Sequence, residues 1–286
     1  MQVKQIEIPL KKSKLIVKII SFLDKAKVLE DKNKFLEIVC NELRNLKEKD
    51  HFGGFLDENG FRSHLETFLF DKQQTLKRYP SGKIEFKDVV KEVEWVIRKT
   101  HNILGKREII IYILPTNSLF IIKKMGGVTG WPAWENIVHI YVYPTKNWRL
   151  NFKSTLLHEL AHSMQDYYSY EMNLFDHLIA DGLAEHFQEK FLNGKRNPFT
   201  KVVSKKKAKE IFKKVRPFMN KTMTDSDPDI HVELFFGSKK YPHWAGYTIG
   251  YYLVEDFLKN KKHISWEKLF RQKPQEFLKE LEDWFK

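Results

Sequence analysis

Apolar positions along the first 104 residues recur mostly with a helical period, which predicts a mainly helical N-terminal region. Its last helix is predicted to end at Gly105, after four apolar residues at helical spacing: Val89, Val93, Val96 and Ile97. We therefore expect a domain boundary here, which divides the chain into residues 1–104, of unknown role, and residues 105–286.

The pattern then changes to short, strongly apolar runs typical of buried strands. Three such strands are predicted, at Glu108–Leu114, Leu119–Ile122 and Ile137–Tyr143, with His139 on a polar face. The glycine-rich run Met125–Pro132 between them predicts either an ordinary turn or a loop leading to an edge strand that pairs with an extended peptide. It lacks the glycine, lysine and hydroxyl spacing of a phosphate-binding loop.

Helical spacing returns in the second half of the chain. One helix carries Leu156, Leu157, Leu160, Ala161 and Met164, with Asn151 or Ser154 as its expected cap and residues 167–170 as its end. A second helix is predicted for residues 173–192, ending at Asn193-Gly194.

Further helices are expected towards the C-terminus. A basic helix with Ala208, Ile211, Phe212 and Val215 on its apolar side is stopped by Pro217, and an acidic turn follows at residues 225–229. A last long apolar segment opens at residues 241–251. Strands in one stretch and helices in others predict an α+β fold.

The first of these helices contains His158, Glu159 and His162 in a His-Glu-x-x-His pattern. Residues four apart project from one helix face, so both imidazoles could bind one Zn²⁺, and Glu159 could take a proton from water. The alternative is that both histidines bond to polar neighbours in the core. A catalytic zinc site needs a third protein ligand, for which His177, Asp181 and Glu185, each four apart on the next helix, are candidates.

The segment Ile179–Phe187 resembles the second zinc segment of gluzincin metallopeptidases, in which a Glu-Gly pair follows the second histidine at this distance. It is similar, more closely, to the bacterial family of predicted zinc-dependent proteases (YjaZ-like). The resemblance covers residues 119–258 at most and implies a zincin-like catalytic domain, a small mixed sheet with helices that carry the His-Glu-x-x-His pattern. The chain departs from the pattern at Asp181, which is one methylene shorter than the family's glutamate.

Residue by residue, the resemblance implies that Asp181 is the third zinc ligand. Glu185 then accepts the other N–H of a ligating histidine, which fixes its tautomer. Glu185 or His177 as the ligand remains open, as does an exposed acidic helix face. Gly182 argues against that exposed face, because glycine inside a helix costs about 1 kcal/mol and indicates a close backbone approach.

A donor for the oxyanion of peptide hydrolysis is expected near residues 241–251. The family has a similar Gly-Tyr-x-x-Gly run near its C-terminus, which makes Tyr247 the first candidate and His243 the second. The alternative is that Gly246 and Gly250 merely let two helices pack closely.

Composition narrows the class of protein. The chain has 286 residues, 42% of them hydrophobic, which suffices for a large core, and its one cysteine, Cys40, excludes an intramolecular disulfide and reads as a core residue. The lysines before residue 24 disfavour a standard secretion signal, and no apolar run approaches the roughly 20 residues of a membrane span, so a cytoplasmic location is expected.

The net charge of +13 is compatible with nucleic-acid binding or with acidic substrates. The cationic side chains crowd the basic helix around its apolar side, as on a solvated face, and lack a nucleic-acid-binding signature, so nucleic acid is an unlikely partner. The sequence thus predicts a zinc peptidase acting on peptides or proteins. The alternatives are a non-peptide amide hydrolase with the same site, or a binding, chaperone-like or nucleic-acid-binding protein with a structural zinc. Neither the substrate nor the oligomeric state follows from the sequence.

Overall fold

The computed structural model describes residues 1–10, 13–45, 52–70, 79–105, 108–134, 136–169, 171–222, 229–261 and 263–285. The described chain divides into two compact units, Met1–Ser163 and Met164–Lys286. No helix in these ranges is long and apolar enough to cross a lipid bilayer.

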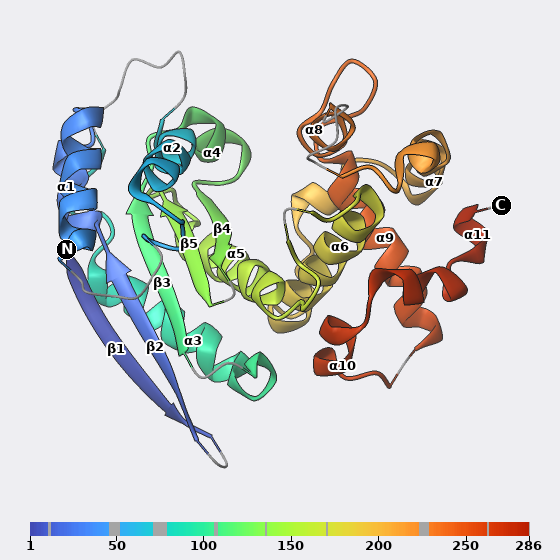
Figure 1. Ribbon diagram of the computed structural model, residues 1–286, viewed down its shortest axis with the longest axis horizontal. Helices are drawn as coiled ribbons and strands as arrows, with labels where there is room; N and C mark the ends of the chain where they lie inside the picture. Colours follow the sequence, from blue (N-terminus) through green and yellow to red (C-terminus); the bar gives the residue numbers. More distant parts are fainter. Residues whose placement is uncertain are drawn as a thin grey trace. The chain divides into compact units, whose positions relative to one another are not determined.

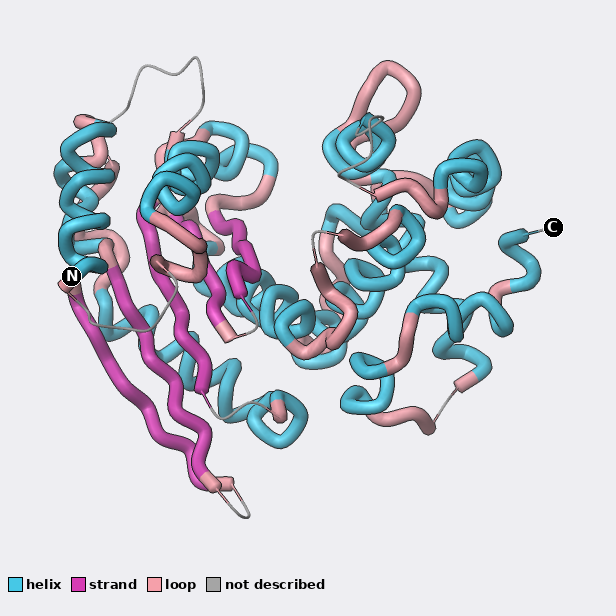
Figure 2. The backbone as a smooth tube through the Cα atoms, viewed as in Figure 1, coloured by secondary structure: helices cyan, strands magenta, loops and turns pink. Residues whose placement is uncertain are grey.

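The first unit is built on a five-stranded mixed sheet (Figures 1 and 2). In spatial order the strands are β1 (Gln2–Pro9), β2 (Lys14–Ser21), β3 (Glu108–Pro115), β5 (Ile137–Val142) and β4 (Val128–Trp134). The pairs β2–β3 and β3–β5 are parallel, whereas β1 and β4 run antiparallel to their neighbours and form the two edges.

Helices cover both faces of this sheet. On one face, α1 (Lys32–Arg44) and α2 (Glu58–Leu69) share a buried core with Tyr112 of β3 and Tyr141 of β5. On the other, α5 (Trp148–Ser163) packs against β4, β5 and α3 (Phe86–Leu104), and α3 also contacts β1 and β2. Further short helical segments are η1 (Leu23–Val28) and α4 (Leu119–Lys124).

Residues 1–104 contain helices, as predicted, and in addition two strands that the helical period did not predict. In β2, Leu15, Val17 and Ile19 are fully buried while the residues between them are not, which is the period of two of a strand. The β-branched residues on this face favour a pleated surface over a helix. The predicted boundary after residue 104 lies inside the first unit, because β2 pairs with β3.

The strands predicted at Glu108–Leu114 and Ile137–Tyr143 are confirmed as β3 and β5, but the strand predicted at Leu119–Ile122 is wrong. That run forms α4, because the Ser118 hydroxyl caps a helix by accepting the Ile121 N–H at 3.4 Å. Positive φ angles of 69° and 88° at Gly126 and Gly127 make the turn before β4, which starts at Val128. The expected edge strand after this turn is therefore present.

The prediction that His139 occupies a polar face is also wrong. Its side chain is fully buried under α2, where Nε2 donates to the Gly53 carbonyl at 2.7 Å. Two neighbouring predictions are confirmed. Gly105 ends α3 with a φ of 61°, and Cys40 is a buried core residue.

The second unit consists of helices and the turns between them (Figure 1). The α-helices are α6 (Leu174–Phe191), α7 (Lys205–Val215), α8 (Asp229–Phe236), α9 (Ala245–Asn260), α10 (Trp266–Arg271) and α11 (Glu282–Phe285), and the 3-10 segments are η2 (Pro198–Lys201), η3 (Arg216–Phe218) and η4 (Pro274–Glu280). The helices predicted for residues 173–192 and for the basic segment are confirmed as α6 and α7. Residues 225–228 of the predicted acidic turn lie outside the described residues.

Close contact between α6 and α9 forms the centre of the second unit. A Cβ added to Gly182 would collide with the Gly250 carbonyl, and a Cβ added to Gly250 would collide with the Leu178 carbonyl. A Cβ on Gly246 would lie 2.9 Å from the Phe235 ring. The interpretation of these glycines as helix-packing residues is therefore confirmed.

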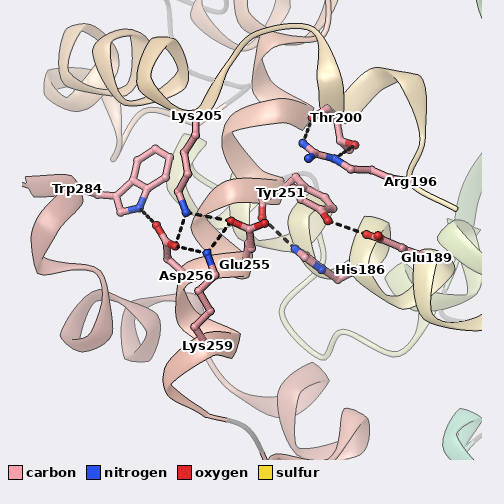
Figure 3. Close-up of polar contacts among 10 residues, drawn as sticks. All are labelled: His186, Glu189, Arg196, Thr200, Lys205, Tyr251, Glu255, Asp256, Lys259 and Trp284. Atoms are coloured by element: carbon pink, nitrogen blue, oxygen red, sulfur yellow. Dashed lines mark hydrogen bonds and ion pairs between the residues drawn. The ribbon is translucent and has the colours of Figure 1, made fainter. Parts of the chain in front are cut away.

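Polar contacts beside this glycine contact join α6 and α7 to α9 (Figure 3). His186 of α6 donates from Nε2 to the Tyr251 carbonyl at 3.0 Å, and the Tyr251 hydroxyl donates to Glu189 at 2.7 Å. Lys205 of α7 donates to Glu255 at 2.9 Å and also pairs with Asp256. These groups hold the face of α6 that carries His186.

Candidate metal centre

Helix α5 presents the two histidines of the His-Glu-x-x-His pattern on one face. Its other side is fixed by fully buried apolar residues: Phe152, Leu156, Leu157, Leu160 and Ala161. The helix begins at Trp148 and ends at Ser163, earlier than the predicted limits at both ends. Asn151 is not its cap, because the Asn151 amide lies within the first turn and donates to the Gly126 carbonyl at 2.8 Å.

The imidazoles of His158 and His162 converge on one point. Their Nε2 atoms lie 3.0 Å apart, and the rings meet nearly edge to face, with centroids 4.7 Å apart and planes at 80°. Two nitrogens that share a tetrahedral zinc ion at about 2.0–2.1 Å lie roughly 3.3 Å apart, so the observed spacing fits a common metal ion. His162 is buried and His158 is half-buried.

Glu159 lies one step round the helix and is buried, at 6% exposure. Its side chain crosses the backbone of β4 at Gly130, where an added Cβ would lie 2.7 Å from Glu159 Oε1 and would collide with Glu159 Cγ. A side chain at residue 130 would therefore force the Glu159 carboxylate to move. Sequence reasoning did not single out Gly130, although a glycine inside a strand is itself a signal of close approach.

Helix α6 carries the candidate carboxylates. The Asn173 side chain caps it by accepting the Asp176 N–H at 2.9 Å, and Asp181 and Glu185 are 3% and 1% exposed. The alternative of an exposed acidic helix face is therefore wrong. The Asn197 amide donates to Glu185 Oε1 at 3.4 Å.

His177 contacts Asp181 directly, since its Nε2 lies 3.2 Å from Asp181 Oδ2, one helical turn along α6. Its other ring nitrogen, Nδ1, lies 3.4 Å from Nδ1 of His231, a buried residue of α8. His231 Nε2 donates to the Lys221 carbonyl at 2.9 Å. Sequence reasoning missed His231, because the residue has no motif and reaches this place only through packing.

One group of three side chains among the described residues could hold a metal ion: His158, His162 and Asp181. Each offers one ligand atom, and these atoms lie within 4.8 Å of one another. Two imidazole nitrogens and a carboxylate oxygen form a donor set that suits Zn²⁺ and leaves a position for water. The residues present therefore fit a zinc ion.

The remaining predicted residues lie at and before the start of α9. Tyr247 is half-buried, with its ring edge-on to Phe235 at 5.2 Å. The His243 ring lies 4.6 Å from that of Trp244, a non-glycine residue with a φ of 66° that precedes α9. These contacts orient both side chains but do not test either as an oxyanion donor, so that role stays a prediction.

The fold and the site together define a class of protein. It is a chain of mixed α and β structure in which two histidines and a carboxylate could hold a metal ion. The family model described as "Predicted Zn-dependent protease (DUF2268)" matches residues 89–279, and the chain belongs to this family. The match runs from α3 to η4 and includes both helices of the candidate centre. Neither the curated proteins nor the solved structures that were searched contain a match.

Proposed function

We propose that the chain is a zinc-dependent peptidase of the zincin-like, gluzincin type, with His158, His162 and Asp181 as zinc ligands. The convergence of two imidazole nitrogens at 3.0 Å on the helix that also carries Glu159 is the observation that carries this proposal. The family description and the buried carboxylate of Asp181 support it.

Zinc held by such ligands supplies a Lewis acid, which polarises a carbonyl and lowers the pKa of water to about 7. Glu159 is the general base, which takes a proton from the attacking water and later delivers it to the leaving amine. Gly130 aids this role, because the absence of a side chain there lets the Glu159 carboxylate lie against β4.

Other residues complete the proposed site. Tyr247, or else His243, donates a hydrogen bond to the oxyanion that forms on the substrate carbonyl. Glu185, buried on α6, accepts the N–H of a ligating histidine and so fixes its tautomer. An extended peptide substrate pairs with β4, which is an edge strand of the described sheet and so the kind of strand to which a peptide can add.

Replacing the general base tests the proposal. Glu159→Gln should keep about one zinc per chain and lose turnover by on the order of 10²–10⁴, because the amide cannot accept the proton. Metal analysis and hydrolysis of a diverse peptide library measure the two effects. The matched control is Glu189→Gln, which also changes a carboxylate that accepts a hydrogen bond, here from Tyr251, but should keep both properties. Parental turnover in Glu159→Gln would rule out the mechanism, and a zinc ion with four protein ligands would favour a structural zinc.

A further inference from the structure

We propose that His177 and His231 are positioning residues that hold the Asp181 carboxylate in the orientation needed to bind zinc. The inference deepens the proposed function and rests on it, because it takes Asp181 as the third ligand. The residues involved all lie in the second unit, on α6 and α8 and in the turn at Lys221.

The first contact in this arrangement is between His177 and Asp181. His177 Nε2 lies 3.2 Å from Asp181 Oδ2, which is within the range of an ion pair. The two residues are four apart on α6, which keeps them on one face of the helix.

His177 is itself held from two sides. The Phe235 ring stacks on the imidazole at a centroid distance of 4.3 Å and an angle of 20°, and His231 Nδ1 lies 3.4 Å from His177 Nδ1. A ring with these neighbours has little freedom to rotate. Its Nε2 therefore stays beside Asp181.

His231 is anchored in turn by the backbone. Its side chain is 2% exposed, and its Nε2 donates to the Lys221 carbonyl at 2.9 Å, which fixes a proton on that nitrogen because a carbonyl only accepts. The same carbonyl accepts the N–H of Leu174, the first residue of α6, at 2.9 Å. The first residue of α6 and His231 of α8 thus donate hydrogen bonds to the same carbonyl.

The shortness of Asp181 explains why such an arrangement is needed. A side chain one methylene shorter than glutamate has fewer rotamers with which to reach a metal ion, so the angle of its carboxylate matters more. The polar neighbours of a ligating carboxylate set that angle, and losing such a neighbour typically costs about 10–100-fold in metal affinity or activity. His177 then acts through Asp181, and the alternative in which His177 itself binds the metal is disfavoured.

Zinc affinity of the full chain, measured by competition with a chromophoric chelator, tests the inference. His177→Ala should weaken zinc binding by about 10–100-fold, and His231→Ala should weaken it less. His177→Gln keeps an N–H donor and should recover much of the affinity. The visible absorption of the cobalt-substituted chain should change in His177→Ala and return towards the parental spectrum in His177→Gln, a response that a merely structural role would not give.

The matched control is His186→Ala. His186 lies on the same helix, donates to a backbone carbonyl and stacks on Tyr251 at 4.1 Å and 18°, as His177 stacks on Phe235 (Figure 3). His186 differs from His177 in the group that its Nε2 contacts, which is the Tyr251 carbonyl instead of the Asp181 carboxylate. Zinc affinity in His186→Ala should therefore stay within about twofold of the parent, whatever thermal stability is lost.

Two results would overturn the inference. The first is parental zinc affinity in a folded His177→Ala, and the second is an equal loss of affinity in His177→Ala and His186→Ala. If the parental chain binds zinc and either result is found, the inference fails while the proposed function stands. If the parental chain binds no zinc, the proposed function fails and the inference fails with it.

Discussion

Two histidine pairs lie on opposite faces of one sheet and have different surroundings. The His158 and His162 nitrogens are 3.0 Å apart on the α5 face, and His139 Nδ1 lies 3.3 Å from His64 Nε2 on the α2 face. Successive residues of β4 face the two pairs in turn. Gly130 contacts Glu159 of α5, and the ring of the next residue, Trp131, lies 5.3 Å from the His64 ring, measured between centroids. Close approach of two imidazoles therefore does not by itself define a metal site.

The neighbours of each pair decide its chemistry. His64 and His139 lie among aromatic rings that include Phe61, Phe68 and Tyr141, and His139 donates to a backbone carbonyl. Burial, reinforced for His64 by the nearby His139, lowers the pKa of His64 to about 2, and burial lowers that of His139 to about 4. Both are neutral at pH 7, and His139 is fully buried whereas His64 is half-buried. The α5 pair instead has carboxylates for neighbours, namely Glu159 in the same helix and Asp181 in the candidate metal group.

Removing one histidine from each pair tests this comparison with the largest expected effect. His162→Ala should purify largely free of zinc and inactive, because it deletes a proposed ligand. His139→Ala should keep its zinc but lose about 1–3 kcal/mol or more of unfolding free energy, because it leaves the buried Gly53 carbonyl without this donor. Metal analysis and urea unfolding measure the two effects. Loss of zinc from the His139 variant alone would reverse the roles of the pairs.

The carboxylates are the second feature that separates the pairs. Asp181→Ala should purify largely zinc-free, whereas Glu185→Ala should keep zinc with affinity or activity reduced about 10–100-fold. Asp181→Glu should restore binding, because it recreates the glutamate of the gluzincin pattern. The metal content of the three variants shows which of the two carboxylates binds zinc. Full occupancy in Asp181→Ala with loss in Glu185→Ala would exchange the two assignments, and full occupancy in both would exclude this segment as the ligand source.

Helical periodicity allowed α5, α6 and the histidine spacing to be predicted, because residues four apart on a helix meet whatever the rest of the chain does. It failed for Leu119–Ile122, since a run of four apolar residues fits a short helix or a strand equally well. It also missed β1 and β2, where lysine and glutamate alternate with β-branched residues. Gly130 and His231 could not be found in this way, because their roles depend on contacts made only after folding.

A substitution in β4 affects one face of the sheet and should leave the other pair unchanged. Gly130→Ala should lower turnover by about 10²-fold, because a displacement of the general base by about 1 Å can cost that much. The steric overlap between the added methyl group and Glu159 should also lower the free energy of unfolding by about 1–3 kcal/mol. Gly60→Ala in α2 is the control, because its added Cβ would approach no atom closer than 3.5 Å. Parental peptide hydrolysis by a folded Gly130→Ala would show that Glu159 does not need this position.

The smallest expected effect is on the pH dependence of stability, to which the pair His64 and His139 should contribute. Because folding lowers the pKa of His64 and His139 below the usual 6.5, the unfolded chain binds more protons than the folded chain at pH 5. The stability that these neutral histidines contribute is therefore complete above pH 6.5 and falls as the pH drops from 6.5 towards their folded values. The slope is at most about 1.4 kcal/mol per pH unit for each histidine.

His64→Phe should remove the contribution of His64 while filling the same aromatic site beside Phe55 and Phe68. Urea unfolding of the zinc-free chain at pH 7 and pH 5 should then show a loss of stability smaller than the parental loss by about 2 kcal/mol. Zinc is left out of this measurement, because competition between metal and protons at the α5 pair would add a pH dependence of its own. His263→Gln, at an exposed position, should behave as the parent does. An unchanged pH dependence in His64→Phe would mean that protonation of His64 does not limit the stability of the fold.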